Sequence, residues 1–224
     1  MPVISFASPK GGVGKTTAAV ILAGELVAAG RRVCLIDADP NRPVVRWAAL
    51  QPLPPGLSIV ADESAETIID TIEAARAVAD FVIVDLEGTA TDRVGYAIAR
   101  SDLVLIPLQP SVLDATEATK AMKLVRQMSR VANRDIPYRL FFSRIAAAIR
   151  ERTAKDLEAQ IAANGAAVLA AAIVDRAAFR ALFSLGGTLD MLDAKDVSGL
   201  KGARDNALAF AQGVVEIFAK RKAA

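Results

Sequence analysis

The chain has 224 residues, of which 53% are hydrophobic and 23% charged, with one cysteine, no histidine and a net charge of +2. This composition excludes an intramolecular disulfide, a histidine-based catalytic triad and a cysteine/histidine zinc site. The length suits one α/β domain over residues 1–224, and no apolar run approaches the roughly 20 residues that span a membrane. The N-terminus enters an apolar segment with no basic-then-apolar leader, so we expect a cytoplasmic protein.

Apolar runs alternate with helical patterns, which predicts an α/β fold with a mostly parallel, twisted sheet covered by helices on both faces. The expected strands are Val3–Ala7, Arg32–Asp37, Leu57–Val60, Phe81–Asp85, Leu103–Pro107, Arg139–Ser143 and Ala167–Ala171. The expected helices are Lys15–Ala29, Val44–Ala49, Ala65–Ala77, Thr91–Arg100, Ala115–Val131, Glu151–Ala163, Arg176–Leu185 and Leu200–Lys220. The loops that follow the strands meet at one edge of such a sheet, where ligands bind.

A glycine-rich loop joins the first strand directly to the first helix. Its residues are Lys10, Gly11, Gly12, Val13, Gly14, Lys15, Thr16 and Thr17. The three glycines let backbone N–H groups converge on an anion, and the helix points its positive end at the same place. Lys15 can reach the β- and γ-phosphates of ATP, and the Thr16 hydroxyl can bind Mg²⁺.

The loop departs from the general pattern G-x-x-x-x-G-K-[ST], because Pro9 stands where the first glycine would be and a second lysine, Lys10, follows. The run Lys-Gly-Gly-Val-Gly-Lys-Thr-Thr resembles the deviant Walker A motif of the ParA/MinD family of P-loop ATPases. In that family the early lysine reaches the nucleotide held by the other subunit. The resemblance therefore implies that ATP closes a homodimer, with Lys10 and Lys15 both acting in catalysis.

The second expected strand ends in two aspartates, Asp37 and Asp39, which share one face of the strand beside the glycine loop. The block resembles the switch I segment of the ParA/MinD family, with Asn41 where glutamine is usual. The resemblance implies that Asp39 positions or polarises the attacking water and that Asp37 supports the Mg²⁺ shell. The longer run through Pro43, with Arg46-Trp47 after it, resembles a subgroup of small ParA proteins of plant-associated bacteria, which includes a ParA homologue of T-DNA transfer.

The fourth expected strand, Phe81–Asp85, is a Walker B pattern in which Asp85 would hold Mg²⁺. The next residues differ from the proline-containing switch II of many family members. Gly88 could present its backbone N–H on the γ-phosphate side. Glu87 has two interpretations, a second water-activating group or, the favoured one, a surface carboxylate. By position, Ser143-Arg144 and the segment that ends at Asp175 are expected to flank the adenine.

The charges divide along the chain. Residues 1–119 carry 9 Lys and Arg against 15 Asp and Glu, a balance of −6, and residues 120–224 carry 18 against 10, a balance of +8. The basic half could form a polyanion-binding face, and a solvated surface without a partner is the alternative. Around Arg176 the chain resembles a family segment in which an arginine contributes to DNA binding. The candidate DNA contacts are Arg176, Arg180, Lys201 and Arg204, with Lys195 beside them.

The last expected helix carries a broad apolar face, which we expect to pack on the protein rather than on a membrane. The family resemblance implies a slow ATPase that binds DNA non-specifically as the ATP dimer, without a helix-turn-helix. A ParB-like or other adaptor protein would stimulate hydrolysis, and the task would be plasmid or chromosome partition or cargo positioning on the nucleoid. The alternatives are a MinD-like membrane-surface regulator, an accessory DNA-binding ATPase of conjugative or T-DNA transfer, and a dethiobiotin synthetase-like ligase.

Overall fold

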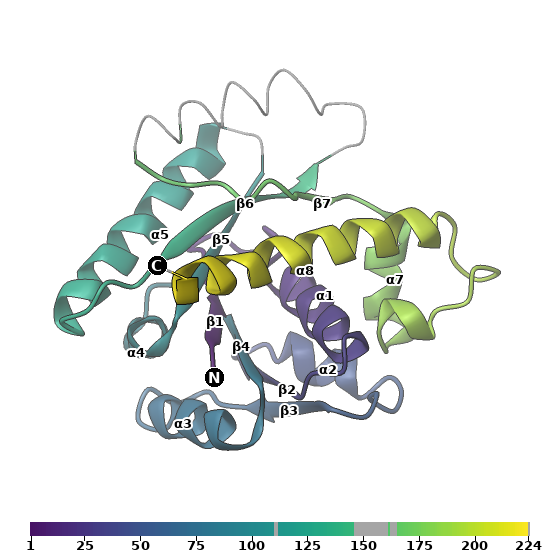
Figure 1. The fold of residues 1–224 in the computed structure, drawn as a ribbon, viewed down its shortest axis with the longest axis horizontal. Coiled ribbons are helices and arrows are strands. Elements are labelled where there is room, and N and C mark those ends of the chain that lie inside the picture. Colours follow the sequence, from purple (N-terminus) through teal and green to yellow (C-terminus); the bar gives the residue numbers. More distant parts are fainter. Residues whose placement is uncertain (110–111, 146–160, 162–164, 224) are drawn as a thin grey trace.

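A computed structural model describes residues 1–109, 112–145, 161 and 165–223. In this part of the chain seven strands form one sheet in the order β3-β2-β4-β1-β5-β6-β7, and all paired neighbours run parallel (Figure 1). The strands are β1 (Val3–Phe6), β2 (Val33–Ala38), β3 (Leu57–Ala61), β4 (Phe81–Leu86), β5 (Leu103–Leu108), β6 (Tyr138–Ile145) and β7 (Ile173–Val174). The expected α/β fold with a parallel sheet is confirmed.

Helices cover both faces of the sheet. Their bounds are α1 (Lys15–Ala28), α2 (Pro43–Ala48), α3 (Ile68–Val78), α4 (Asp92–Arg100), α5 (Val112–Val131), α7 (Ala177–Leu185) and α8 (Leu200–Ala223), with a 3-10 turn η1 (Leu189–Met191). Helices α1, α2, α7 and α8 contribute to one hydrophobic cluster, and α3, α4 and α5 contribute to the other. Successive strand residues alternate between the clusters, because Val3 belongs to the second and Ile4 to the first.

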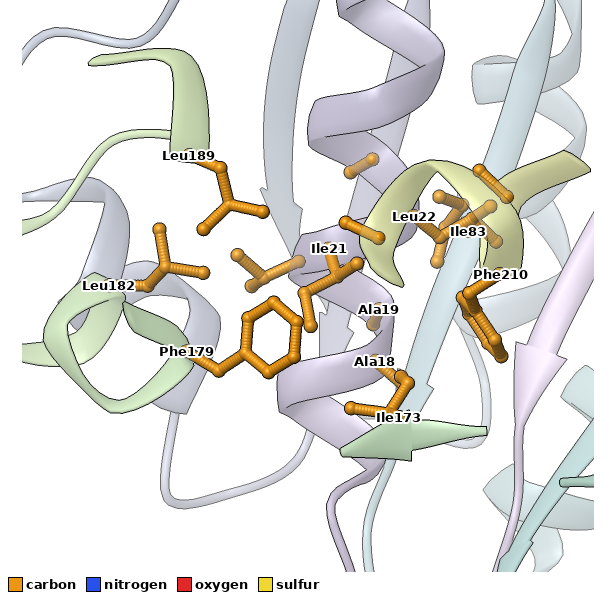
Figure 2. Close-up of a cluster of buried hydrophobic side chains, with 14 of the residues drawn as sticks. Ala18, Ala19, Ile21, Leu22, Ile83, Ile173, Phe179, Leu182, Leu189 and Phe210 are labelled. Carbon is orange, nitrogen blue, oxygen red and sulfur yellow. The ribbon is translucent and has the colours of Figure 1, made fainter. Parts of the chain in front are cut away.

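Helix α1 lies at the centre of the first cluster. Figure 2 shows its apolar side chains between Phe179 and Leu182 of α7 on one side and Phe210 of α8 with Ile83 of β4 on the other. The residues of α1 labelled there are Ala18, Ala19, Ile21 and Leu22, and each is at least 98% buried. Packing of this density holds the N-terminal end of α1, and with it the glycine loop, in a fixed position above the sheet.

Helix α8 packs on the body of the protein, as its apolar pattern predicted. Ala203, Ala207, Phe210 and Val214 are fully buried, and Figure 1 shows the helix lying across α1. No helix among the described residues is long and apolar enough to span a membrane. The expectation of internal packing is confirmed for this face of α8, whereas Leu208 and Val215 beside it are 49% and 38% exposed.

The expected strand Ala167–Ala171 is wrong. Only Val168 of this stretch forms a bridge, to Leu140, and the strand beside β6 is the two-residue β7. The stretch is rich in alanine, which is depleted in strands, whereas the paired residues Ile173 and Val174 are β-branched and buried. The expected helix Glu151–Ala163 lies outside the described residues, except for Ile161.

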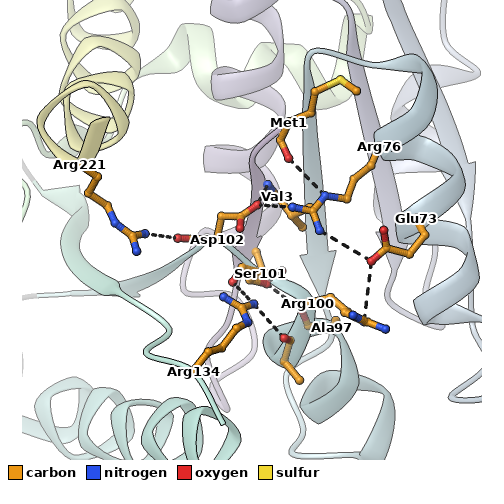
Figure 3. Close-up of polar contacts among 12 residues, drawn as sticks. Met1, Val3, Glu73, Arg76, Ala97, Arg100, Ser101, Asp102, Arg134 and Arg221 are labelled. Atoms are coloured by element: carbon orange, nitrogen blue, oxygen red, sulfur yellow. Dashed lines mark hydrogen bonds and ion pairs between the residues drawn. The ribbon is translucent and has the colours of Figure 1, made fainter. Parts of the chain in front are cut away.

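A polar network closes the edge of the sheet at which the strands begin. Figure 3 shows the Asp102 carboxylate accepting hydrogen bonds from the Val3 amide at 2.8 Å and from Arg76 Nη2 at 3.0 Å. Arg134 donates to the carbonyl oxygen of Ser101 at 2.6 Å, and Arg221 of α8 donates to that of Asp102 at 3.1 Å. These contacts tie α3, α8 and the loop after α5 together at the edge opposite the glycine loop.

A half-buried carboxyl on α1, that of Glu25, makes the free energy of unfolding depend on pH. Burial and, to a lesser extent, the charge of Asp190 raise the pKa of Glu25 to about 7, and Arg204 acts against this increase. The folded chain therefore holds a proton that the unfolded chain releases near its ordinary pKa of 4.5, and stability falls as pH rises from there to about 7. We expect Glu25→Gln to raise the free energy of unfolding at pH 8 by about 1–2 kcal/mol and to flatten this decline.

Urea unfolding at pH 5 and pH 8 measures the effect, with Glu66→Gln at an exposed position as the control. A decline in Glu25→Gln as steep as in the wild type would contradict the assignment.

Candidate nucleotide-binding site

A cavity of about 400 Å³ lies at the carboxyl ends of the central strands, where the expected ligand edge is. It is lined by Gly11, Gly12, Gly14, Lys15, Thr16, Thr17, Asp39, Pro40, Asn41, Glu87, Gly88, Thr89 and Arg144. The loops after β1, β2 and β4 and the end of β6 thus contribute to one concave surface. Five residues predicted to bind nucleotide or metal do not line it, namely Lys10, Val13, Asp37, Asp85 and Asp175.

The glycine loop is shaped for an anion. Gly14 precedes α1 with φ +100°, in the left-handed region, and the described part of the chain shows no side-chain cap at this helix start. The Ser143 hydroxyl of β6 donates to the Val13 carbonyl oxygen at 2.6 Å. A Cβ atom at Gly14 would lie 3.5 Å from that of Ser143. The helix start, with its exposed N–H groups and positive dipole end, is a suitable place for phosphate.

Lys15 is 7% exposed at the base of the cavity. Its Nζ donates to the carbonyl oxygens of Ser8 at 3.4 Å and Lys10 at 3.3 Å. Burial lowers the pKa of this ammonium, and the charges of Asp85, Asp39 and Glu87 act against the decrease. The charges of three carboxylates therefore act on this buried ammonium, one from the loop after β2 and two from the end of β4 and the loop that follows it.

Asp85 is completely buried and accepts a 2.6 Å hydrogen bond from the Thr16 hydroxyl. Its second oxygen, Oδ1, has no partner among the described residues. Burial, with the charge of Asp37, raises the pKa of Asp85 to about 7, and the Thr16 hydrogen bond and the Lys15 charge act against this increase. An unpartnered buried carboxylate oxygen beside a hydroxyl suits a hard cation such as Mg²⁺.

The described residues contain no group of three or more carboxylate, cysteine or histidine side chains placed to hold a metal. Mg²⁺ does not need such a group, because it usually keeps several waters and binds one or two carboxylates together with substrate phosphates. The oxygen donors Thr16 and Asp85 therefore fit the predicted ion.

Asp37 is buried and does not line the cavity. Its Oδ2 accepts the backbone N–H groups of Val44 at 2.8 Å and Val45 at 2.9 Å, in the first turn of α2. Burial raises the pKa of Asp37, and these hydrogen bonds, with a third from the Asp39 amide, oppose the increase. Asp37 thus caps a helix that begins six residues later, a function that its place at the end of a strand did not suggest.

The cavity-lining Asp39 is held by Asn41. Its Oδ1 accepts the Asn41 backbone N–H at 2.8 Å and the side-chain amide at 3.0 Å. The asparagine that replaces the usual glutamine therefore orients this carboxylate within a tight turn.

Glu87 is not a surface carboxylate, since its side chain is only 12% exposed. It accepts hydrogen bonds from the Thr89 and Thr91 hydroxyls and forms an ion pair with Arg93, which is 7% exposed. Burial alone would raise the pKa of Glu87, but the hydrogen bonds from Thr89, Arg93 and Thr91 bring it below its ordinary value. Sequence reasoning missed Arg93, because a lone arginine in an amphipathic helix has no distinguishing pattern.

The residues expected to flank the adenine or to contact DNA differ in where they lie and what they contact. Arg144 lines the cavity with φ +53° at a register shift in β6, whereas Asp175 forms an ion pair with Arg180 outside it. Arg204 donates to the Leu189 carbonyl oxygen at 2.9 Å and pairs with Asp190 at 3.4 Å.

Among the remaining candidate DNA contacts, Arg176 is half-buried against Gly202, with its Nε unpartnered among the described residues. Lys195, Lys201 and the side chain of Arg180 are exposed.

Comparisons with known proteins agree with this geometry. The family model described as VirC1 protein matches residues 1–204. The chain is 36% identical over 214 residues to protein ParA of Rhizobium radiobacter, covering 96% of each, and 33% identical over 150 residues to protein virC1 of Rhizobium rhizogenes, covering 65% of each. Among solved structures, the ATP complex of a McdA variant from Cyanothece has the same fold, with a TM-score of 0.74 at 16% identity over 96% of each chain.

Proposed function

The chain belongs to the VirC1 family, and on this basis we propose that its residues 1–224 form one ParA-type ATPase domain. In this proposal ATP closes a homodimer, the dimer binds DNA non-specifically, and slow hydrolysis to ADP and phosphate, stimulated by a partner, returns it to monomers. The observation that carries the proposal is the buried Lys15, with Thr16 hydrogen-bonded to Asp85 beneath an uncapped helix start.

The glycine loop would hold the phosphates through its backbone N–H groups, and Lys15 would bind oxygens of the β- and γ-phosphates. Thr16 and Asp85 would hold Mg²⁺, and Asp37 would support that site from behind. When bound, Mg²⁺ neutralises phosphate charge and orients the triphosphate. Thr17, Val13 and Gly88 complete the proposed nucleotide contacts, and Asp175 with Arg144 stays the proposed boundary of the adenine site.

Asp39 is the proposed residue that orients the attacking water. Its carboxylate lines the cavity and is fixed by Asn41, and its charge acts on the Lys15 ammonium. Gly88 lies so close to the glycine loop that a Cβ atom there would be 3.3 Å from the Gly11 nitrogen. A phosphate that arrives between the two loops would therefore contact the segment after β4 directly.

Lys10 is the proposed link between two copies of the chain. It begins the glycine loop but does not line the cavity of its own chain. In the family resemblance this lysine acts on the nucleotide of the other subunit, so the second copy would complete the site. This requirement argues against a dethiobiotin synthetase-like ligase, which needs no lysine from a partner.

The proposed DNA contacts are phosphate contacts without base readout, from Arg180 and Lys201 with Arg176 and Arg204 beside them. The basic half of the chain favours this surface. Partition or positioning on the nucleoid through a ParB-like adaptor is the first candidate task. An accessory function in DNA transfer is the second, favoured by the similarity to virC1. Burial of the apolar face of α8 disfavours a membrane-surface regulator.

The test is DNA binding and oligomeric state of the wild type with ATP, ADP or no nucleotide, across a salt series and with unrelated DNA sequences. We expect an ATP-dependent dimer whose sequence-independent DNA affinity falls steeply with salt. Lys10→Ala should remain monomeric with ATP and bind DNA at least about tenfold more weakly, because DNA contacts from two chains act together.

Arg31→Ala, an exposed substitution, is the control and should behave as the wild type. An ATP dimer of Lys10→Ala in gel filtration would remove the proposed action of Lys10 across the interface. DNA binding that is equal with ATP and ADP would contradict the proposed cycle.

A further inference from the structure

We propose that the Glu87–Arg93 ion pair sets the preference of the cavity for a nucleoside triphosphate over a diphosphate, with Arg93 as a positioning residue. The inference rests on the proposed nucleotide site and adds a residue to it. The pair joins the loop after β4 to the first turn of α4, and it lies next to the cavity without belonging to the glycine loop.

The Glu87 carboxylate is the centre of a cluster of hydrogen bonds. The Glu87 carboxylate accepts hydrogen bonds from the Thr89 hydroxyl at 2.7 Å, the Thr91 hydroxyl at 2.8 Å and Arg93 Nη2 at 2.5 Å. Thr91 also caps α4, since its hydroxyl oxygen accepts the Val94 N–H. All donors come from within six residues of Glu87, so the carboxylate closes this loop on itself and fixes its shape.

The cluster stands at the end of the cavity where the third phosphate of ATP is expected. Glu87, Gly88 and Thr89 line the cavity, and the charge of Glu87 acts on the Lys15 ammonium. Asp39 and Asp85 act on the same ammonium, so the charges of three carboxylates act on one buried lysine. A γ-phosphate would bring further negative charge to this place, whereas ADP, which lacks it, would not.

Arg93 lies behind the wall of the cavity and offsets the negative charge of Glu87. It does not line the cavity, is 6% exposed as a residue, and its Nε has no partner among the described residues. Screening by water is weak at such burial, so an unpaired Glu87 would repel the third phosphate strongly. The ion pair therefore permits the triphosphate, and its loss penalises ATP more than ADP.

The experiment compares the Kd values of a non-hydrolysable ATP analogue and of ADP, both with Mg²⁺, by isothermal titration calorimetry. Arg93→Gln should weaken binding of the ATP analogue by about 10–100-fold and of ADP by less than about threefold, a range set by one unpaired buried charge. The double variant Glu87→Gln/Arg93→Gln removes both charges and should restore the wild-type ratio to within about threefold. Arg100→Gln, at an exposed ion pair on the same helix, is the matched control.

If Arg93 acted only on the structure, Arg93→Gln would weaken the binding of the ATP analogue and of ADP equally. That result, or any other result that leaves the ratio of the two Kd values unchanged, would overturn the inference. If Arg93→Gln does not fold, Glu87→Gln alone decides, since it removes the charge and keeps the loop length. Glu87→Gln should change the ratio of the two Kd values in favour of the ATP analogue. A change in favour of ADP, or no change, would also overturn the inference. A wild type that binds neither nucleotide would overturn the proposed function itself, whereas one that binds both with an unmoved ratio overturns only this inference.

Discussion

Replacing Lys15 with alanine is expected to weaken ATP binding by roughly a hundredfold or more. Among the described residues, the buried ammonium has two contacts, both long, to backbone carbonyl oxygens at 3.3 and 3.4 Å, which leaves hydrogen-bonding capacity for a ligand. Charge-assisted hydrogen bonds to phosphate contribute about 1.5–3 kcal/mol each, and two of them account for this loss. Calorimetric titration with ATP and Mg²⁺ measures it.

The control for this substitution is Lys10→Ala, which should leave ATP binding to a single chain nearly unchanged, because Lys10 does not line the cavity of its own chain. Thermal unfolding should show that Lys15→Ala is folded, since the substitution removes a buried charge whose pKa burial already lowers. An ATP affinity close to that of the wild type would refute the assignment of the glycine loop as the phosphate site.

Replacing Asp39 with alanine is expected to slow hydrolysis by about a hundredfold or more while ATP binding persists. The carboxylate lines the cavity but makes its hydrogen bonds to Asn41, outside the loop that holds the phosphates. Its loss should therefore affect the attacking water more than the bound nucleotide. The variant should accumulate as the ATP dimer, which gel filtration detects beside a phosphate-release assay.

Asp39→Asn separates the charge of this residue from its turn, because the amide oxygen can still accept the Asn41 N–H. If the negative charge orients the water, Asp39→Asn should be nearly as slow as Asp39→Ala. Normal turnover in either variant would contradict the assigned action. If Asp39→Asn hydrolysed ATP much faster than Asp39→Ala, hydrolysis would depend on the turn and not on the negative charge.

The central part of the site could be predicted because its signals are local. The glycines, Lys15 and Thr16 follow one another in the chain, and their spacing alone fits a phosphate. Asp39 and Asp85 could be added because each directly follows a run of strand residues, and parallel strands end at one edge. The lining of the cavity includes Lys15, Thr16, Asp39 and Gly88.

Other residues could not be assigned from pattern. The sequence did not indicate that the Asp37 carboxylate, which stays a proposed support of the metal site, also caps α2, because this contact depends on how the chain turns back after β2. The short strand β7 was misplaced because two residues carry no periodic signal. Arg204 stays a proposed DNA contact, and no pattern indicated that its guanidinium also donates to carbonyl oxygens of η1, more than ten residues earlier.

The sequence by itself determined the phosphate loop, the order of strands and helices and the place of the carboxylates, because motif spacing and hydrophobic period are properties of neighbouring residues. Only the tertiary structure decided which charges are paired and which remain available to a ligand. The Thr16 hydroxyl meets Asp85, 69 positions later in the chain, at 2.6 Å. The Glu87–Arg93 pair joins residues only six positions apart, but the fold around it buries both side chains. Desolvation and pairing are set by segments that meet in space, and no local pattern records them.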